Sequence, residues 1–293
     1  MEEVYKFSLK MANGTEARTL QELRDNFDLI SVLEHYTSGE LSEWLTGSHY
    51  EEEAKLVNAI DSSIDDFEST LCAILRVPFS MEDAVKCFKE AAGRNCAEAQ
   101  FRLGCFYMFG VGVEEDEEKG VRLIRKAAEQ GHIEAQYELG VDYTRGYGVE
   151  ADEEEAMEWF RKAAEQGHVE AQYILGVNYS SGIGTEIEDE EAVKWFQKAA
   201  EQGSIEAEYW LGGCYQLGSG VEKDAEEAVR RYRIAAGLGH AGAQCKLGLC
   251  YLLGDGVGED YEKAAKWLQK AAEQGYPEAM EALDDLLGSD NYE

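Results

Sequence analysis

Apolar and small residues recur along most of the chain at the spacing of amphipathic helices. Ala156, Phe160 and Ala163 fall at i, i+4 and i+7, which places them on one face of a helix. The acidic run at residues 152–155 occupies the first turn, where carboxylates favour the positive end of the helix dipole. Gly167 follows the last turn, as a left-handed residue that ends a helix does. The pattern predicts an amphipathic helix that ends at Gly167.

A second helix follows the first. It carries Ala171, Leu175 and Tyr179 on one face, and a loop with Gly182 and Gly184 leads away from it. The small residues allow neighbouring helices to approach closely. The two helices together form the unit from which most of the chain is built.

This pair of helices returns every 36 residues without an insertion or deletion. The clearest marker is the segment Ala-Ala-Glu-Gln-Gly, with its variants, at residues 91–95, 127–131, 163–167, 199–203, 235–239 and 271–275. One pair cannot bury its apolar face alone, so neighbouring pairs must stack around a continuous core. The sequence therefore predicts a mainly α-helical solenoid of six 36-residue repeats over residues 80–287.

The repeated residues also carry a resemblance. Across residues 135–167 they are Ala135, Leu139, Gly140, Tyr143, Gly146, Gly148, Val149, Asp152, Ala156, Trp159, Lys162, Ala163, Ala164 and Gly167. This pattern resembles the Sel1-like repeat, a relative of the tetratricopeptide repeat, and it covers about two-thirds of the chain. The resemblance implies a right-handed α/α superhelix that acts as an adaptor or scaffold for another protein. It implies no chemistry.

The ends of the array depart from the pattern. In the last unit the Leu-Gly pair becomes Leu283-Asp284 and the tyrosine becomes Leu287, as expected of a terminal repeat that meets solvent. At the other end, residues 61–79 are predicted to form a capping helix, with Phe67 and Leu71 in the repeat positions, and a junction. Residues 288–293 are left as a C-terminal tail.

Residues 1–60 show no repeat. Alternating apolar residues from Tyr5 to Met11 predict a strand, and Asn13-Gly14 is a hairpin turn signal. Thr19 and Glu22 form a capping box that opens a helix, and further short helices follow. We expect a small N-terminal α+β module, made of a β-hairpin and short helices.

Charge narrows the range of partners. The chain has 60 acidic residues against 27 basic ones, a net charge of −33. This field repels phosphate backbones and anionic membrane surfaces, so neither a nucleic acid nor a membrane is expected to bind. At long range the field favours a cationic protein segment. The absence of a long apolar run and of a secretory signal pattern favours a cytoplasmic protein.

Several patterns that could suggest chemistry have simpler explanations. The Gly-x-Gly loops lack a following Lys-Ser/Thr pair, and acids crowd the site a phosphate would need, so we interpret them as helix C-caps. His132, His168 and His240 occupy one repeat position, too far apart to share a metal ion, which favours a capping or turn role. Seven cysteines without a C-x-x-C pair argue for free thiols. We therefore expect no catalytic residues, no cofactor and no metal.

One stripe of residues is the candidate binding surface. Glu155, Trp159 and Lys162 lie at i, i+4 and i+7 beside the apolar face of their helix. Because arginine also occupies the tryptophan position, we expect this position to border a groove and not to lie within the core. Tryptophan and arginine are frequent in binding hot spots. The predicted partner-binding residues are Glu155, Trp159, Lys162, Glu191, Trp195, Lys198, Arg231, Lys263, Trp267 and Lys270.

The leading functional prediction is a scaffold or adaptor that binds an extended peptide or short helix of another protein in the concave groove of the solenoid. Two simpler interpretations remain open at this stage. The tryptophans could cap the core between repeats, and the lysines could serve only favourable helix C-termini. An alternative function, from a different class, is an N-terminal module with its own regulatory or enzymatic activity, targeted by the solenoid.

Overall fold

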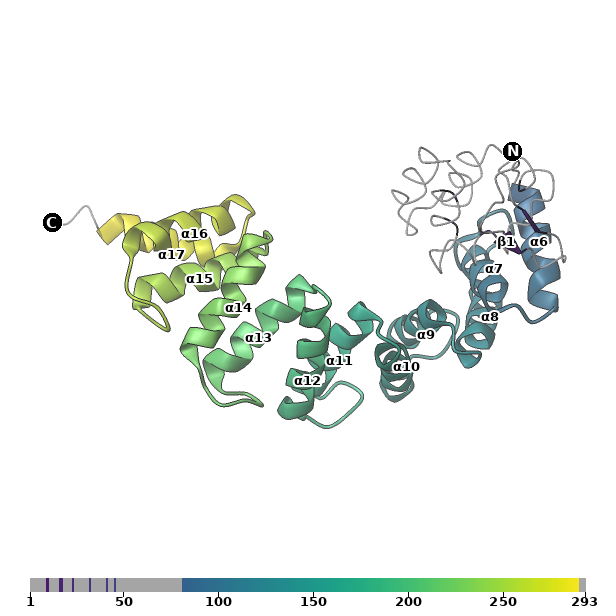
Figure 1. The fold of residues 1–293 in the computed structure, drawn as a ribbon, viewed down its shortest axis with the longest axis horizontal. Helices are drawn as coiled ribbons and strands as arrows, with labels where there is room; N and C mark the ends of the chain where they lie inside the picture. Colours follow the sequence, from purple (N-terminus) through teal and green to yellow (C-terminus); the bar gives the residue numbers. More distant parts are fainter. Residues whose placement is uncertain are drawn as a thin grey trace, which may run out of the picture. The chain divides into compact units, whose positions relative to one another are not determined.

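The computed structural model describes residues 81–289, together with Leu9, Lys10, Glu16, Ala17, Leu23, Val32, Leu41 and Leu45. Across residues 81–289 there are twelve α-helices of 13 residues each (Figure 1). Their bounds are α6 Met81–Gly93, α7 Ala97–Phe109, α8 Glu117–Glu129, α9 Ile133–Arg145, α10 Glu153–Glu165, α11 Val169–Ser181, α12 Asp189–Glu201, α13 Ile205–Leu217, α14 Ala225–Gly237, α15 Ala241–Leu253, α16 Tyr261–Glu273 and α17 Pro277–Ser289.

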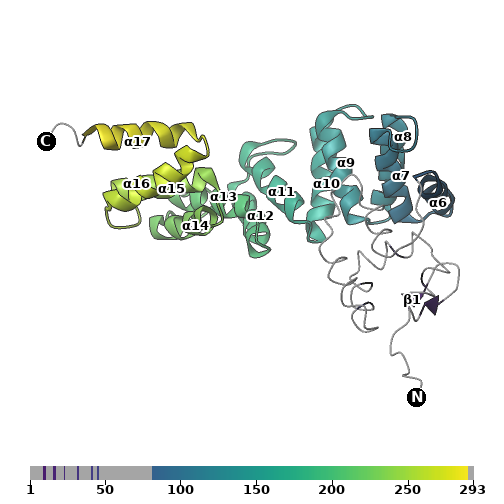
Figure 2. The same cartoon turned by 90° about the horizontal axis from the view of Figure 1, so that it is seen from above.

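Two kinds of helix alternate along the chain. The even-numbered helices α6 to α16 contain the Ala-Ala pair and are called AA helices here. The odd-numbered helices α7 to α17 carry the Leu-Gly position and are called LG helices. Figure 2 shows the same succession of helices from above. The mainly α-helical prediction is therefore confirmed for this part of the chain.

Each kind of helix has its own caps. At the start of AA helix α10, Asp152 accepts hydrogen bonds from the backbone N–H groups of Glu154 and Glu155, both at 3.1 Å. At the start of LG helix α11, the imidazole Nδ1 of His168 accepts from the N–H of Ala171 at 3.2 Å. The LG helix ends at Gly182, whose φ is 72°. The capping interpretations of the histidines and of the first loop glycine are confirmed.

The chain divides into two compact units. One contains residues 1–135 and 147–149, and the other contains residues 136–146 and 150–293. Helix α9 contributes residues to both.

In the first unit, α7 packs against both α6 and α8. Five described N-terminal residues, Ala17, Leu23, Val32, Leu41 and Leu45, are fully buried in one core with α6 and α7. Leu9–Lys10 pairs with Glu16–Ala17 as an antiparallel ladder. The rest of the predicted N-terminal module, the capping helix at 61–79 and residues 290–293 of the tail lie outside the described residues.

In the second unit, each helix from α10 to α17 packs against the next in order. Glycines allow consecutive helices to pack at short distance. A Cβ on Gly176, in the Leu-Gly pair of α11, would lie 2.5 Å from the ring of Phe196 on α12. Phe196 is fully buried at this contact. The Leu-Gly pair is therefore a packing site for a large side chain of the next helix.

None of the helices in the described part of the chain combines the length and apolar character that crossing a bilayer requires.

Candidate interaction surface

The predicted binding residues lie on the AA helices of the second unit. They belong to a row that we call the AA stripe, with three equivalent positions on each helix and a fourth directly after it. These are Glu155, Trp159, Lys162 and Gln166 for α10; Glu191, Trp195, Lys198 and Gln202 for α12; Glu227, Arg231, Ile234 and Leu238 for α14; and Lys263, Trp267, Lys270 and Gln274 for α16.

Lysine and tryptophan meet along the stripe. The Lys162 ammonium lies 3.6 Å from the ring centroid of Trp159, and Lys198 lies 3.6 Å from that of Trp195. The third pair, Lys270 over Trp267, is separated by 4.4 Å. Each pair is i, i+3 on one helix, so the cation lies over the ring face, where the ring quadrupole attracts it. The structure thus brings together the predicted tryptophans and lysines.

The tryptophans are more buried than expected. Trp159 and Trp195 are each only 7% exposed, which contradicts the expectation that they border an open groove. Trp267 is partly buried and packs against the core formed by α14 and α15. The indole N–H of Trp159 is buried without a hydrogen-bond partner among the described residues. The rings belong largely to the core, and the lysines present the polar face of the stripe.

Arginine fits the tryptophan position for a reason that the sequence pattern did not reveal. The Arg231 guanidinium lies 2.7 Å from a carboxylate oxygen of Glu227 and 3.2 Å from one of Glu208. Glu208 is itself buried on α13. Burial disfavours the charged guanidinium, but the hydrogen bonds to Glu227 and Glu208 outweigh it and raise the pKa of Arg231. A second substitution therefore compensates the first, and the position need not be open to solvent.

Glu208 replaces a glutamine that the other repeats use to connect consecutive helices. Gln202, after α12, donates from Nε2 to Oε1 of Gln172 on α11 at 2.8 Å. Gln172 in turn donates to the carbonyl of Ala164 at the end of α10, at 3.0 Å. Equivalent side-chain bonds join Gln166 to Gln136 and Gln274 to Gln244, and, in the first unit, Gln130 to Gln100. This glutamine ladder was not predicted from the sequence, although the glutamine of Ala-Ala-Glu-Gln-Gly recurs at Gln130, Gln166, Gln202 and Gln274.

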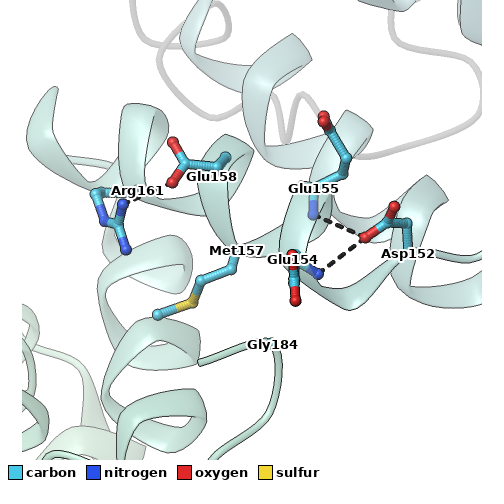
Figure 3. A pocket seen from close by; sticks show the side chains of 7 residues that line it. All are labelled: Asp152, Glu154, Glu155, Met157, Glu158, Arg161 and Gly184. Carbon is cyan, nitrogen blue, oxygen red and sulfur yellow. Dashed lines mark hydrogen bonds and ion pairs between the residues drawn. The ribbon is translucent and has the colours of Figure 1, made fainter. Parts of the chain in front are cut away.

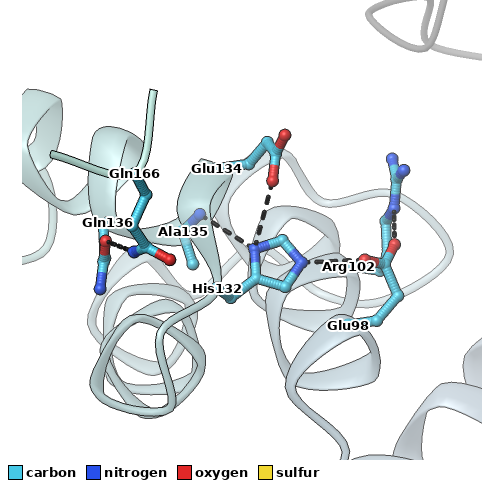
Figure 4. A network of polar contacts seen from close by, with 7 residues as sticks. All are labelled: Glu98, Arg102, His132, Glu134, Ala135, Gln136 and Gln166. Carbon is cyan, nitrogen blue, oxygen red and sulfur yellow. Dashed lines mark hydrogen bonds and ion pairs between the residues drawn. The ribbon is translucent and has the colours of Figure 1, made fainter. Parts of the chain in front are cut away.

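A buried polar network lies in the first unit (Figure 4). Nδ1 of His132 accepts from the N–H of Ala135, so Nε2 carries the proton and donates to Glu98 at 2.8 Å. Arg102 donates to the other oxygen of Glu98 at 2.8 Å. Burial opposes ionisation of Glu98, but the hydrogen bond from His132 and the charge of Arg102 overcome it and lower the pKa of this carboxyl. The network is satisfied internally, which indicates a structural role.

An open pocket of about 310 Å³ lies beside α10 (Figure 3). Its lining residues are Asp152, Glu154, Glu155, Met157, Glu158, Arg161 and Gly184. Arg161 donates to Glu158 at 2.8 Å and to the hydroxyl of Tyr179 at 3.1 Å. Glu155 is the one predicted binding residue in this lining, so the pocket is separate from the tryptophan–lysine pairs.

Metal binding and thiol chemistry are the remaining candidates. Within the described residues, no three His, Cys, Asp or Glu side chains are grouped closely enough to hold a metal ion. Cys214, Cys245 and Cys250 are free thiols. Burial raises the pKa of Cys214, Cys245 and Cys250 to about 11 each, which keeps them protonated at neutral pH.

Comparison with protein families identifies the repeat. The family described as "Sel1 repeat" matches residues 97–132, 133–168, 169–204, 205–240 and 241–276. Each matched repeat begins with an LG helix and ends after the following AA helix. Five repeats are therefore matched where six were expected, and α6 and α17 flank them on either side.

Solved structures show the same family. A Sel1 repeat protein from Oxalobacter formigenes is 35% identical, with a TM-score of 0.65, over 70% of this chain and 86% of its own. A protective antigen present in uropathogenic Escherichia coli strains, which displays an SLR fold, is 30% identical with a TM-score of 0.71. That match covers 91% of this chain, which spans 58% of the antigen's length. No curated protein matches the chain.

Proposed function

Because this chain belongs to the Sel1 repeat family, we propose that it is a scaffold that binds an extended peptide or short helix of a partner protein along the AA stripe. Sel1 repeat proteins generally mediate protein–protein interaction. The finer assignment concerns which residues do so here. It includes Glu155, Trp159, Lys162, Glu191, Trp195, Lys198, Arg231, Lys263, Trp267 and Lys270, and it involves no catalytic step.

The observation that supports the stripe is its row of lysines. Lys162, Lys198 and Lys270 each lie over a tryptophan ring. No carboxylate of the described residues forms an ion pair with them, although acidic residues outnumber basic ones by 60 to 27. An ammonium has three N–H donors, and the ring below leaves donors free for a partner. Repeated at the same position of α10, α12 and α16, such donors suit the carbonyl or carboxylate groups of an extended segment.

Because the tryptophans are buried, the stripe is best tested by substitutions of its lysines. Replacing Trp159 or Trp195 by alanine would remove a buried ring, which costs about 3–5 kcal/mol in a core. Lost binding in that variant could then reflect unfolding. Lysine-to-glutamate changes avoid this problem, because α6 already carries Glu90 at the lysine position.

The experiment is affinity capture with crosslinking from cell extract, comparing the wild type with Lys162→Glu/Lys198→Glu/Lys270→Glu. We expect the variant to lose its partners by about tenfold or more, equivalent to about 1.4 kcal/mol, with unchanged helical circular dichroism. The control, Lys86→Glu/Lys89→Glu/Lys223→Glu, alters the net charge equally at exposed positions away from the stripe. Equal capture by both triple variants contradicts the proposal.

A further inference from the structure

Helix α14 differs from the other AA helices of the second unit at three positions near its C-terminal end. Where α10, α12 and α16 have lysine in the stripe, α14 has Ile234, and where they are followed by glutamine, α14 is followed by Leu238. The glutamate between those positions is replaced by Gly237. All three changes remove polar or negative groups from one end of one helix.

The two apolar side chains remain in solvent. Ile234 is 47% exposed and Leu238 is 60% exposed. They are separated by one helical turn, so they lie on the same face. The repeat fold does not require them, because three equivalent helices carry polar residues there.

The stripe of α16 lies next to these residues. Nε2 of Gln274 donates to the carbonyl oxygen of Gly239, the residue after Leu238, at 3.1 Å. Trp267, two turns before Gln274, is partly exposed and packs against the core shared with α14. We call Ile234, Leu238 and Trp267 the α14 patch. Exposed apolar residues gathered in this way commonly mark a protein contact.

Basic side chains are concentrated beside the patch. From Arg230 onward, α14 contains Arg230, Arg231 and Arg233 and no carboxylate, and of these Arg231 is already paired with Glu227 and Glu208. Arg230 lies one turn before Ile234, and its side chain is 64% exposed. A partner carboxylate can replace Glu227, which lies 2.9 Å from Arg230, because Glu227 keeps its second pair with Arg231 at 2.7 Å. Lys270, one turn before Gln274, has only the Trp267 ring as a described contact. The complement of this surface is an apolar side chain flanked by carboxylates.

We propose that the α14 patch is where the partner is selected, and that it takes an acidic amphipathic segment whose apolar residue packs on Ile234, Leu238 and Trp267. Carboxylates of that segment then pair with Arg230 and Lys270. This inference rests on the proposed scaffold function and adds the chemistry of the partner.

The segment is the opposite of the cationic one favoured by the net charge of −33. Screening limits that field to about 8 Å in physiological salt, so contacts at the patch decide affinity.

Two labelled helical peptides test the inference by fluorescence anisotropy. They share the same leucine positions, and their polar positions are all glutamate in one and all lysine in the other. We expect the acidic peptide to bind the full chain at least about tenfold more tightly than the cationic one. Ile234→Lys/Leu238→Gln should abolish that preference. This variant restores the residues of α12 and α16, so it should fold normally.

A matched control replaces exposed apolar residues elsewhere. Leu217→Gln/Leu253→Lys alters two exposed leucines that end α13 and α15, away from the patch, and should leave binding unchanged. Tighter binding of the cationic peptide, weak binding of both, or unchanged binding by Ile234→Lys/Leu238→Gln overturns the inference. A dimer that this variant dissolves would assign the patch to a second copy instead. None of these results affects the scaffold proposal, which depends on capture through the stripe lysines.

Discussion

A methyl group at Gly184 would lie 2.2 Å from the carbonyl oxygen of Glu153, in the first turn of α10. This glycine is the second of its Gly-x-Gly loop and has a φ of +66°. Gly167 also has positive φ, +97°, but nothing lies within 4 Å of a Cβ built on it. Substitutions at these two glycines therefore distinguish the cost of a positive φ from the cost of a steric clash.

Gly184→Ala should cost about 2–5 kcal/mol of unfolding free energy, because left-handed strain adds to overpacking against backbone. Gly167→Ala is the matched control and should cost only the conformational part, about 1–2 kcal/mol. Urea unfolding followed by circular dichroism measures both. Equal losses would show that the contact with Glu153 relaxes without cost.

A second residue-scale prediction concerns His240, which caps α15. Its Nδ1 accepts from the N–H of Ala243 at 3.0 Å, and its ring stacks on Tyr209 at 4.5 Å. Burial lowers the pKa of His240, and the charge of Glu206 only partly offsets this. Because the folded-state pKa lies below the ordinary value of about 6.5, folding favours the neutral ring. This contribution is complete above about pH 6.5 and is lost as pH falls below it.

His240→Ser should therefore weaken the dependence of stability on pH between about 7.5 and 5. Serine is a suitable replacement because Ser204 caps α13 at the same repeat position. The variant should lose at most about 1 kcal/mol at the higher pH, since it keeps a cap but loses the stack on Tyr209. Thermal unfolding at each pH gives the difference from wild type, and a constant difference would contradict a titrating cap.

At the scale of the helices, features within one helix could be predicted from the sequence, but side-chain contacts between helices could not. Helix starts, helix ends and the cap role of His168 follow from residues within four positions of one another. The glutamine ladder and the Glu208–Arg231 pair join side chains 23 to 30 residues apart. Different residues at one repeat position are therefore not interchangeable, because the residue that each contacts in the next helix changes as well. This is why Arg231 led to the wrong expectation for the burial of Trp159 and Trp195.

That coupling can be measured as a double-mutant cycle between α13 and α14. Glu208→Gln alone should destabilise the protein, because Arg231 loses a carboxylate at 3.2 Å in a partly buried site. Combined with Arg231→Trp and Leu238→Gln, Glu208→Gln gives this repeat the same residues as the neighbouring repeats at these three positions. The combination should recover the lost unfolding free energy. We expect an interaction free energy of about 0.5–3 kcal/mol between position 208 and positions 231 and 238 taken together.

Urea unfolding of Glu208→Gln, Arg231→Trp/Leu238→Gln and their combination provides the cycle. Gln202→Ala tests the intact ladder, since its side chain bonds Gln172 and the carbonyl of Gly167. Additive effects of Glu208→Gln and Arg231→Trp/Leu238→Gln would show that these positions are not coupled.

At the scale of the whole molecule, each described helix of the second unit packs mainly on its neighbours in sequence. Stability in such an array is close to a sum over repeats and their interfaces. A net charge of −33 lowers the free energy of unfolding, because like charges repel one another in the folded chain. The distribution of the acids decides how strongly they do so.

Acids in the first turn of the AA helices favour the helix dipole, but Glu165, Glu201 and Glu273 end theirs, where the dipole is negative. The triple variant Glu165→Gln/Glu201→Gln/Glu273→Gln should therefore stabilise the protein at low salt, by about 0.3–1 kcal/mol per site. Raising salt from about 0.01 M to about 1 M shortens the screening length from about 30 Å to about 3 Å. The wild type should gain stability over that range, and the difference in unfolding free energy between it and the variant should shrink.

Neutralising the first-turn residues Glu153, Glu190 and Glu226 instead should not stabilise the protein, because each loses a favourable interaction with its helix end. Thermal unfolding of the three proteins across the salt series distinguishes position from total charge, since equal gains in both variants would leave only the total.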